Sequence, residues 1–162
     1  MNLKRFIGKL NRVKDVIQLK ARTSYAQSGE DIIIDCLFTS FNYKKITYLD
    51  IGANQPVICN NTYFFYQKGS RGVCVEPDVN MCVAAKAKRP GDNILNIGIG
   101  LSEVKEAAFY LFPGHLNTWS TFSKEEANVR ETASGILAQK IIVPLQTINN
   151  IIEKYIFVTS FS

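Results

Sequence analysis

Two carboxylates at the ends of neighbouring apolar runs suggest a ligand site. Asp50 lies near the end of KITYLDI and is followed by Gly52 in the small turn GAN, and Glu76 closes the run RGVCV. If both runs are parallel strands, the two acids meet at the rim where open α/β sheets bind ligands. There, a carboxylate can accept two hydrogen bonds from a ribose diol, and a glycine turn lets a ligand approach the backbone.

The charge of this rim favours a cationic nucleoside over a pyrophosphate. The turn DIGANQP lacks the GxGxxG pattern of dinucleotide sites, GIGLSE at 98–103 lacks a third glycine, and Asp50 would repel a phosphate. S-adenosylmethionine (SAM) carries a sulfonium, an ammonium and a ribose diol, and no phosphate. The alternative is structural, with Asp50 capping the following turn and Glu76 as an exposed acid at a strand end.

The order of elements predicts an α/β fold with a doubly wound, mostly parallel sheet. We expect strands at 46–51, 71–76 and 93–98, a helix that ends at Gly69, and a helix capped by Asp78. The β-α-β-α-β order implies right-handed crossovers. Later we expect strands at EAAFYLF, NTWSTFS and KIIVPLQTI, a helix or loop at KEEANVRETASG, a helix capped by Thr147, and a further strand that begins IFVTSFS.

The segment TSYAQSGEDIIIDCLF predicts a helix capped by Ser28. Glu30 and Asp31 fall in its first turn, where acids suit the positive end of the helix dipole. An inward stripe is expected to follow, formed by Ile32, Ile33, Cys36 and Leu37. Capping accounts for the acids but leaves Gln27 without a local role.

Most of the positive charge lies at the start of the chain. Residues 1–22 hold seven Lys or Arg and a single Asp, while the whole chain has a formal net charge of +5. Their apolar residues recur at helical spacing, which predicts a basic amphipathic leader helix at 1–22 before a domain at 23–162. Such a helix can lie on an anionic membrane, dock on a partner or pack on its own domain. The body of the chain has no nucleic-acid signature.

Cysteine and histidine usage argues against a zinc site. Four cysteines at 36, 59, 74 and 82 form no CxxC pair, and there is one histidine. The sequence has neither a secretory apolar region nor a run of ~20 apolar residues. We therefore expect no metal, reduced thiols and a cytoplasmic protein, peripheral to a membrane only through residues 1–22.

Several stretches, in order, resemble one family. The stretch YLDIGANQPVICNNTYFFYQKGSRGVCVEPD is similar to the SAM-binding core of FkbM-type methyltransferases. The upstream SYAQSGEDIIIDCLF resembles the segment that precedes that core. NIGIGLSEVKEAAFYLF and VPLQTINNIIEKY resemble the third strand, the hairpin and the later helix entry. The resemblance runs from about residue 24 to residue 155.

The resemblance implies a Rossmann-like methyltransferase fold and O-methyl transfer from SAM to a hydroxyl acceptor, often on a sugar of a surface polysaccharide or on a secondary metabolite. It implies that Asp50, Gly52 and Asn54 line the methionine side of SAM and that Glu76 holds the ribose. Residues that match the upstream motif, and would close over the cofactor, are Gln27, Glu30 and Asp31. Residues that would brace the turn are Asn61 and Thr62.

Two features leave the activity of this chain open. The acceptor's proton needs a base, and His115 in a Pro-Gly loop is either that base or a surface residue. The family continues into a strand ending in Asp-x-Glu-Gly, which is absent after IFVTSFS. We therefore expect the N-terminal portion of the sheet, an incomplete fold and impaired activity. The alternatives are a noncatalytic nucleoside-binding or membrane-docking module, and a nicotinamide-type oxidoreductase, which the missing glycines disfavour.

Overall fold

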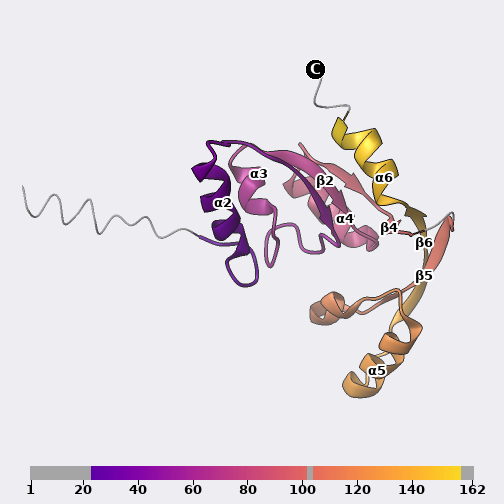
Figure 1. Cartoon of the computed structure of the whole chain (residues 1–162). Coiled ribbons are helices and arrows are strands. Elements are labelled where there is room, and N and C mark those ends of the chain that lie inside the picture. Colours follow the sequence, from indigo (N-terminus) through magenta and orange to yellow (C-terminus); the bar gives the residue numbers. More distant parts are fainter. Residues whose placement is uncertain (1–22, 102–103, 158–162) are drawn as a thin grey trace, which may run out of the picture.

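The computed structural model describes residues 23–101 and 104–157, and its centre is a three-stranded parallel sheet in the order β1-β2-β3 (Figure 1). The strands are β1 Thr47–Ile51, β2 Arg71–Val75 and β3 Asn93–Leu95. Asp50 pairs with Cys74, and Cys74 pairs with Ile94. The parallel pairing is that of an α/β fold, as the sequence predicts. In the described part of the chain β1 is an edge strand.

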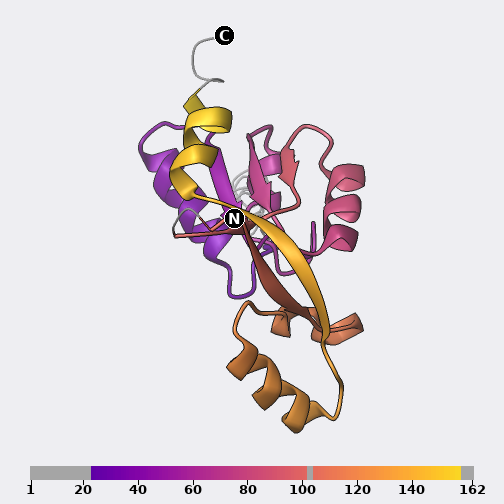
Figure 2. The same ribbon diagram turned by 90° about the vertical axis from the view of Figure 1, so that its right-hand side faces the viewer.

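Helices cover both faces of this sheet. On one face, Phe65 packs against Tyr48 and Cys74 in one core cluster. On the other face, Ile151 packs against the β2 valines in a second cluster, and its helix crosses the sheet in Figure 2. The helices are α3 Tyr63–Gln67 and α4 Val79–Lys88 on the first face, and α6 Ile148–Ile151 with the π-helix η2 Ile152–Phe157 on the second.

The helix α2 (Glu30–Ser40) has an inverted pattern of burial. Its N-cap is Gly29 with φ 86°, and no side chain caps it, so the expected Ser28 cap is wrong. The expected inward stripe is also wrong, because Ile33 is 69% exposed and Leu37 is 55% exposed. The buried side chains are instead Asp31 and Asp35.

These two buried acids explain the orientation of α2. Asp31 accepts hydrogen bonds from Ser24 Oγ at 2.7 Å and from the backbone N–H of Tyr25 at 2.7 Å. Asp35 forms an ion pair with Lys68, which follows α3. Asp31 therefore faces the segment before α2 and Asp35 faces the end of α3, while Ile33 and Leu37 face outward.

A second sheet, in the order β4-β6-β5, projects from the first (Figures 1 and 2). β4 runs parallel to β6, and β5 is antiparallel to β6. The elements are β4 Gly98–Ile99, β5 Glu106–Leu111, the 3-10 helix η1 Gly114–Trp119, α5 Lys124–Ser134 and β6 Gln139–Gln146. We call β5, η1, α5, β6 and the loops between them the arm.

Several sequence predictions hold, while others fail for local reasons. Asp78 and Thr147 cap their helices as expected, and Gly69 follows α3 with φ 88°. The expected strand at 93–98 is split, because the side-chain amide of Asn96 donates to the carbonyls of Glu76 and Pro77 at 3.0 and 2.8 Å. The chain thus leaves the first sheet after β3.

Three further stretches differ from expectation. NTWSTFS is not a strand, since most of it lies in or after η1 and only Thr121 makes a bridge, to Tyr110. KEEANVRETAS forms α5, whose first turn is capped by Ser123. The expected strand that begins IFVTSFS is wrong at 156–157, which belong to η2, and residues 158–162 lie outside the described residues.

The predicted leader at 1–22 also lies outside the described residues. Among the residues that the structure does describe, no helix combines the length and apolar character needed to cross a membrane. The same residues contain no group of three or more His, Cys, Asp or Glu side chains placed to hold a metal ion.

Candidate functional site

Asp50 and Glu76 leave the same face of adjacent strands. Asp50 is the register partner of Cys74, and Glu76 follows Cys74 by two residues, so the alternation of a strand turns both carboxylates to one side. Both are mostly removed from water, and burial raises the pKa of each above its ordinary value. The two carboxyl groups therefore lie on one side of the sheet, at the carboxyl ends of β1 and β2.

Glu76 is held by backbone donors on both of its oxygens. Its Oε1 accepts from the N–H of Asp78 at 2.8 Å, and its Oε2 accepts from the N–H of Asn54 at 2.7 Å. Burial raises the pKa of Glu76, these two bonds lower it in part, and the nearby charges of Asp78 and Asp50 raise it further. Each oxygen keeps lone-pair capacity for another donor.

The turn after β1 is tied to the end of β2. The N–H groups of Gly52 and Ala53 both donate to the carbonyl of Val75, at 2.9 and 3.1 Å. Gly52 has φ 73° and Asn54 has φ 47°, so the turn uses the left-handed region twice. A Cβ on Gly52 would meet no atom within 4 Å, so backbone conformation is what favours glycine here.

The carboxylate of Asp50 is turned into a buried polar cluster. Its Oδ2 accepts from Thr62 Oγ1 at 2.5 Å, and Thr62 Oγ1 in turn accepts from Arg89 Nη2 at 2.8 Å. Burial raises the pKa of Asp50, and the Thr62 hydrogen bond and the charge of Arg89 offset only part of this rise. Asp50 thus ties the end of β1 to Thr62 at the start of α3.

Arg89 is the centre of this cluster, and sequence reasoning missed it. Its side chain is 1% exposed and pairs with Asp92, which is fully buried, at 2.8 Å. Further donations reach Asn60 Oδ1 at 3.0 Å and Tyr48 Oη at 3.1 Å. In the sequence, the only local indication of this cluster is the i,i+3 spacing of Arg89 and Asp92 across the Pro-Gly that follows a predicted helix.

Asn60 connects Arg89 to the turn after β1 through hydrogen bonds. Its side-chain amide donates to the carbonyls of Ala53 and Gln55 at 3.0 and 3.1 Å, and its Oδ1 accepts from Arg89. The carbonyls on either side of Asn54 are therefore fixed, which aims the N–H of Asn54 at Glu76. The resemblance gave a bracing role to Asn61 and Thr62. In the structure Asn60 and Thr62 make these hydrogen bonds, whereas the side chain of Asn61 is exposed.

A cavity of about 310 Å³ opens beside this rim. Gly52, Asn54 and Glu76 line it from the first sheet, and the first turn of α4 contributes Asp78 and Met81. Its volume is at the lower end of the range for small-molecule sites. Among the described residues, none of those that line it is Lys, Arg or His. We call it the rim cavity.

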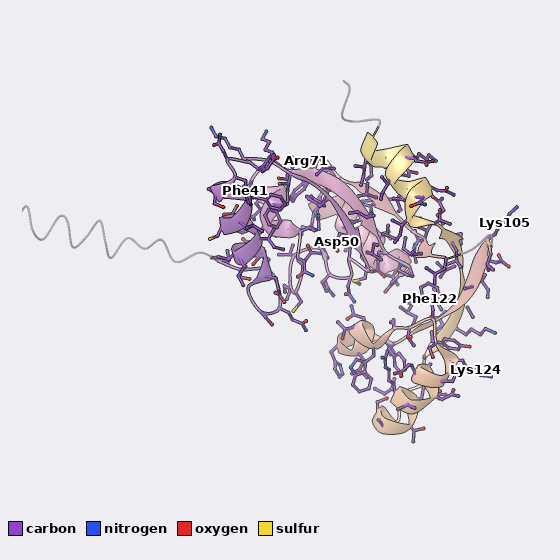
Figure 3. The ribbon with its side chains drawn as sticks, in the orientation of Figure 1. Phe41, Asp50, Arg71, Lys105, Phe122 and Lys124 are labelled. Carbon is purple, nitrogen blue, oxygen red and sulfur yellow. The ribbon has the colours of Figure 1, made fainter. Side chains whose placement is uncertain are left out.

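The arm supplies the opposite wall of the rim cavity. Phe109 and Phe122 line it with ring centroids 4.7 Å apart, and Phe122 lies on the side of the arm nearer the first sheet in Figure 3. The absence of a side chain at Gly98 leaves room for the Phe122 ring, because a Cβ at Gly98 would lie 2.4 Å from Phe122 Cζ. Neither aromatic residue was predicted from the sequence, since both belong to the arm.

The remaining candidate residues lie elsewhere. Asp50 does not line the rim cavity. Gln27 and Glu30 are exposed, and the carboxylate of Glu30 accepts from the N–H of Ser28 at 2.8 Å. Hydrogen bonds from Ser24, Tyr25, Ala26 and Ile32 hold the pKa of Asp31 below its ordinary value although burial opposes them. His115 is exposed on η1 and lines neither the rim cavity nor its neighbours.

Comparison with known proteins adds one finding. A family model described as the methyltransferase FkbM domain matches residues 50–161. No curated protein and no solved structure matches the chain. The matched range contains Asp50, Glu76, the turn, Arg89 and the whole arm. It leaves out Tyr48 of the Arg89 cluster and the upstream residues Gln27, Glu30 and Asp31. The chain belongs to the FkbM methyltransferase domain family.

Proposed function

We propose that this protein binds SAM in the rim cavity and transfers its methyl group to a hydroxyl, on a sugar or another hydroxyl-bearing acceptor. The observation that carries the proposal is the carboxylate of Glu76, which stands in the cavity wall at the end of β2 with one backbone donor on each oxygen. That position suits a ribose diol, since the diol can donate to the lone pairs that remain.

The charge of the cavity supports a cationic nucleoside. Glu76 and Asp78 line it, and no basic residue does so in the described part of the chain. A pyrophosphate would need compensating donors or cations that this lining does not supply. SAM supplies a methyl group already activated on a sulfonium, so the protein's main task is to bind and orient it beside the acceptor.

Individual residues take separate roles in this proposal. Glu76 holds the ribose, and Gly52 and Asn54 offer close backbone approach to the methionine part. The Phe109 and Phe122 rings offer an apolar wall for the base. Asp50 contributes indirectly, because it binds Thr62, which contacts the Asn60 side chain that holds the turn. Gln27, Glu30 and Asp31 would have to act from the edge of the site.

Calorimetry tests the proposal. Titration with SAM, with its demethylated product S-adenosylhomocysteine and with NAD should give binding of the first two ligands and none of NAD. Incubation with methyl-labelled SAM and a panel of sugars should then transfer label to an acceptor. Binding of NAD without SAM would exclude the proposal, and SAM binding without transfer to any hydroxyl compound would reduce the protein to a noncatalytic nucleoside-binding module.

A further inference from the structure

A second cavity of about 580 Å³ lies next to the rim cavity. Its walls come from the turn after β1, the first turn of α4, the end of β5 with the following η1, and the start of β6. Asp78, Met81 and Asn117 line both cavities. The two are therefore neighbours across a thin partition, and we call the second one the arm groove.

Asn117 is the centre of the partition. Its side-chain amide donates to Asn54 Oδ1 at 3.0 Å and lies 3.7 Å from the sulfur of Met81. One residue of η1 thereby contacts both the turn after β1 and helix α4. A molecule in the arm groove would be separated from a molecule beside Asn54 only by these side chains.

The lining of the arm groove is rich in neutral hydrogen-bonding groups. The side chains of Gln55, Asn80 and Gln139 are exposed amides in its walls, and Asn117 adds a fourth. Apolar surface lies beside these amides and comes from five residues: Met81, Leu111, Phe112, Pro113 and Leu137. Amides offer both donors and acceptors, which is what hydroxyl groups need for complete hydrogen bonding.

The charge of the arm groove excludes acidic ligands. Asp78 is its only charged residue among those described, and its Oδ1 already accepts from the N–H of Asn80 at 2.8 Å. No Lys, Arg or His of the described chain lines it. A phosphate or carboxylate placed here would lose water without gaining a cation, and it would face a like charge.

We propose that the arm groove binds the methyl acceptor, and that this acceptor is an uncharged, hydroxyl-rich molecule. The inference rests on the proposed function, because it assumes a donor in the rim cavity with its ribose on Glu76. The turn from Gly52 to Asn54 then borders the methionine part of the donor. The partition at Asn117 is next to this part, because Asn117 donates to Asn54. The acceptor hydroxyl reaches the donor past Asn117.

One substitution can fill the arm groove and spare the rim cavity. Asn80 is exposed and lines the groove but not the rim cavity, and the helix cap at Asp78 uses the backbone N–H of Asn80 rather than its side chain. Asn80→Trp should therefore block the groove without loss of the helix cap. Asn128→Trp is the matched control, because Asn128 is also exposed and helical but lines neither cavity.

The probes are methyl hexopyranosides and the corresponding 6-phosphates, observed by saturation-transfer NMR with saturating S-adenosylhomocysteine. We expect the neutral glycosides to bind the wild-type chain and the Asn128→Trp chain alike, and Asn80→Trp to weaken them at least tenfold. Calorimetry should give the same S-adenosylhomocysteine affinity for all three proteins.

The outcomes separate the two proposals. If the wild-type chain does not bind S-adenosylhomocysteine, the proposed function is overturned, and so is the groove assignment that rests on it. If S-adenosylhomocysteine binds but no glycoside does, or if Asn80→Trp binds glycosides like the wild type, the groove assignment alone is wrong. Binding of the 6-phosphates as tight as that of the neutral glycosides overturns the uncharged acceptor.

Discussion

The backbone N–H of Asn54 donates to Oε2 of Glu76 at 2.7 Å and thereby joins the turn after β1 to the end of β2. Because Gly52 and Ala53 also donate to the carbonyl of Val75, three hydrogen bonds hold the turn, two to Val75 and one to Glu76. The carboxylate that faces the rim cavity thus serves the fold and the site together. Its removal has consequences for both.

Replacement of Glu76 should weaken SAM binding. Glu76→Gln keeps the shape of the side chain but loses the charge, and hydrogen bonds to a charged group are worth about 1.5–3 kcal/mol. We expect the dissociation constant from calorimetry to rise roughly 10- to 100-fold. Glu106→Gln, at an exposed position on β5, is the control and should bind like the wild type. Equal affinities in the two variants would remove Glu76 from the site.

The pH dependence of SAM binding should reflect the raised pKa of Glu76. Burial moves this pKa above its ordinary 4.5, so on acidification the carboxylate is neutralised earlier than an exposed glutamate. We expect SAM affinity to fall as the pH decreases toward the raised value, and the profile of Glu76→Gln to be flatter. Parallel profiles in the two proteins would show that Glu76 does not titrate against the ligand.

The raised pKa of Glu76 also affects folding stability, and its dependence on pH is opposite to that of SAM binding. A carboxyl group whose pKa is raised in the folded state contributes stability that is complete below its unfolded value, here 4.5, and is lost as the pH rises through the folded value. Urea denaturation of the Glu76→Gln variant and the wild type between pH 4 and pH 8 should therefore show the wild type losing relative stability as the pH rises. A constant difference between the two would contradict the shift.

Loss of Arg89 should unfold much of the protein. Arg89→Met leaves the buried Asp92 without its cation, and breaking a buried pair in this way costs about 3–5 kcal/mol. Arg89→Lys retains the charge but cannot donate to Asp92, Asn60, Tyr48 and Thr62 together, so an intermediate loss is expected. Urea denaturation measures both, with Lys88→Met on the exposed side of α4 as control. A free energy of unfolding in Arg89→Met within 1 kcal/mol of the control, on the order of a surface substitution, would refute the central role of Arg89.

A single methyl group at Gly98 should disturb the aromatic wall. The new Cβ would lie 2.4 Å from Phe122 Cζ and 2.7 Å from Leu145 Cδ2, so Phe122 must leave its place. We expect Gly98→Ala to weaken SAM binding about fivefold, since an aromatic contact is worth about 1 kcal/mol. Gly100→Ala is the matched control, because its nearest neighbour would be 3.3 Å away. Unchanged binding in Gly98→Ala would show that the ligand does not use this wall.

The sequence was sufficient for features that depend on strand ends and caps. The placement of Asp50 and Glu76 at one edge of the sheet follows from the rule that parallel strands end at the same edge, although Asp50 is buried away from the cavity. The Asp78 and Thr147 caps follow from local hydrogen bonding. Gly52, Asn54 and Glu76 line one cavity because all three are within a few residues of strand ends. Such features need no knowledge of distant contacts.

The arm and the Arg89 cluster depend on contacts that a periodic pattern does not encode. Asn117 and Asn54 are 63 residues apart, and Arg89 and Tyr48 are 41 residues apart. The split between β3 and β4 depends on the hydrogen bonds that the Asn96 amide donates to the carbonyls of Glu76 and Pro77. On α2 the apolar pattern was misleading, because ion pairing and hydrogen bonding of Asp31 and Asp35 decide which face turns inward.

The only tryptophan of the chain, Trp119, lies close to residues that line each of the two cavities. Its ring packs on Phe112, which lines the arm groove, with centroids 6.2 Å apart, while its neighbours Thr118 and Ser120 line the rim cavity. The native protein thus contains its own fluorophore, and emission from this one indole should respond to occupancy on either side. Binding in both places can be followed optically without any label.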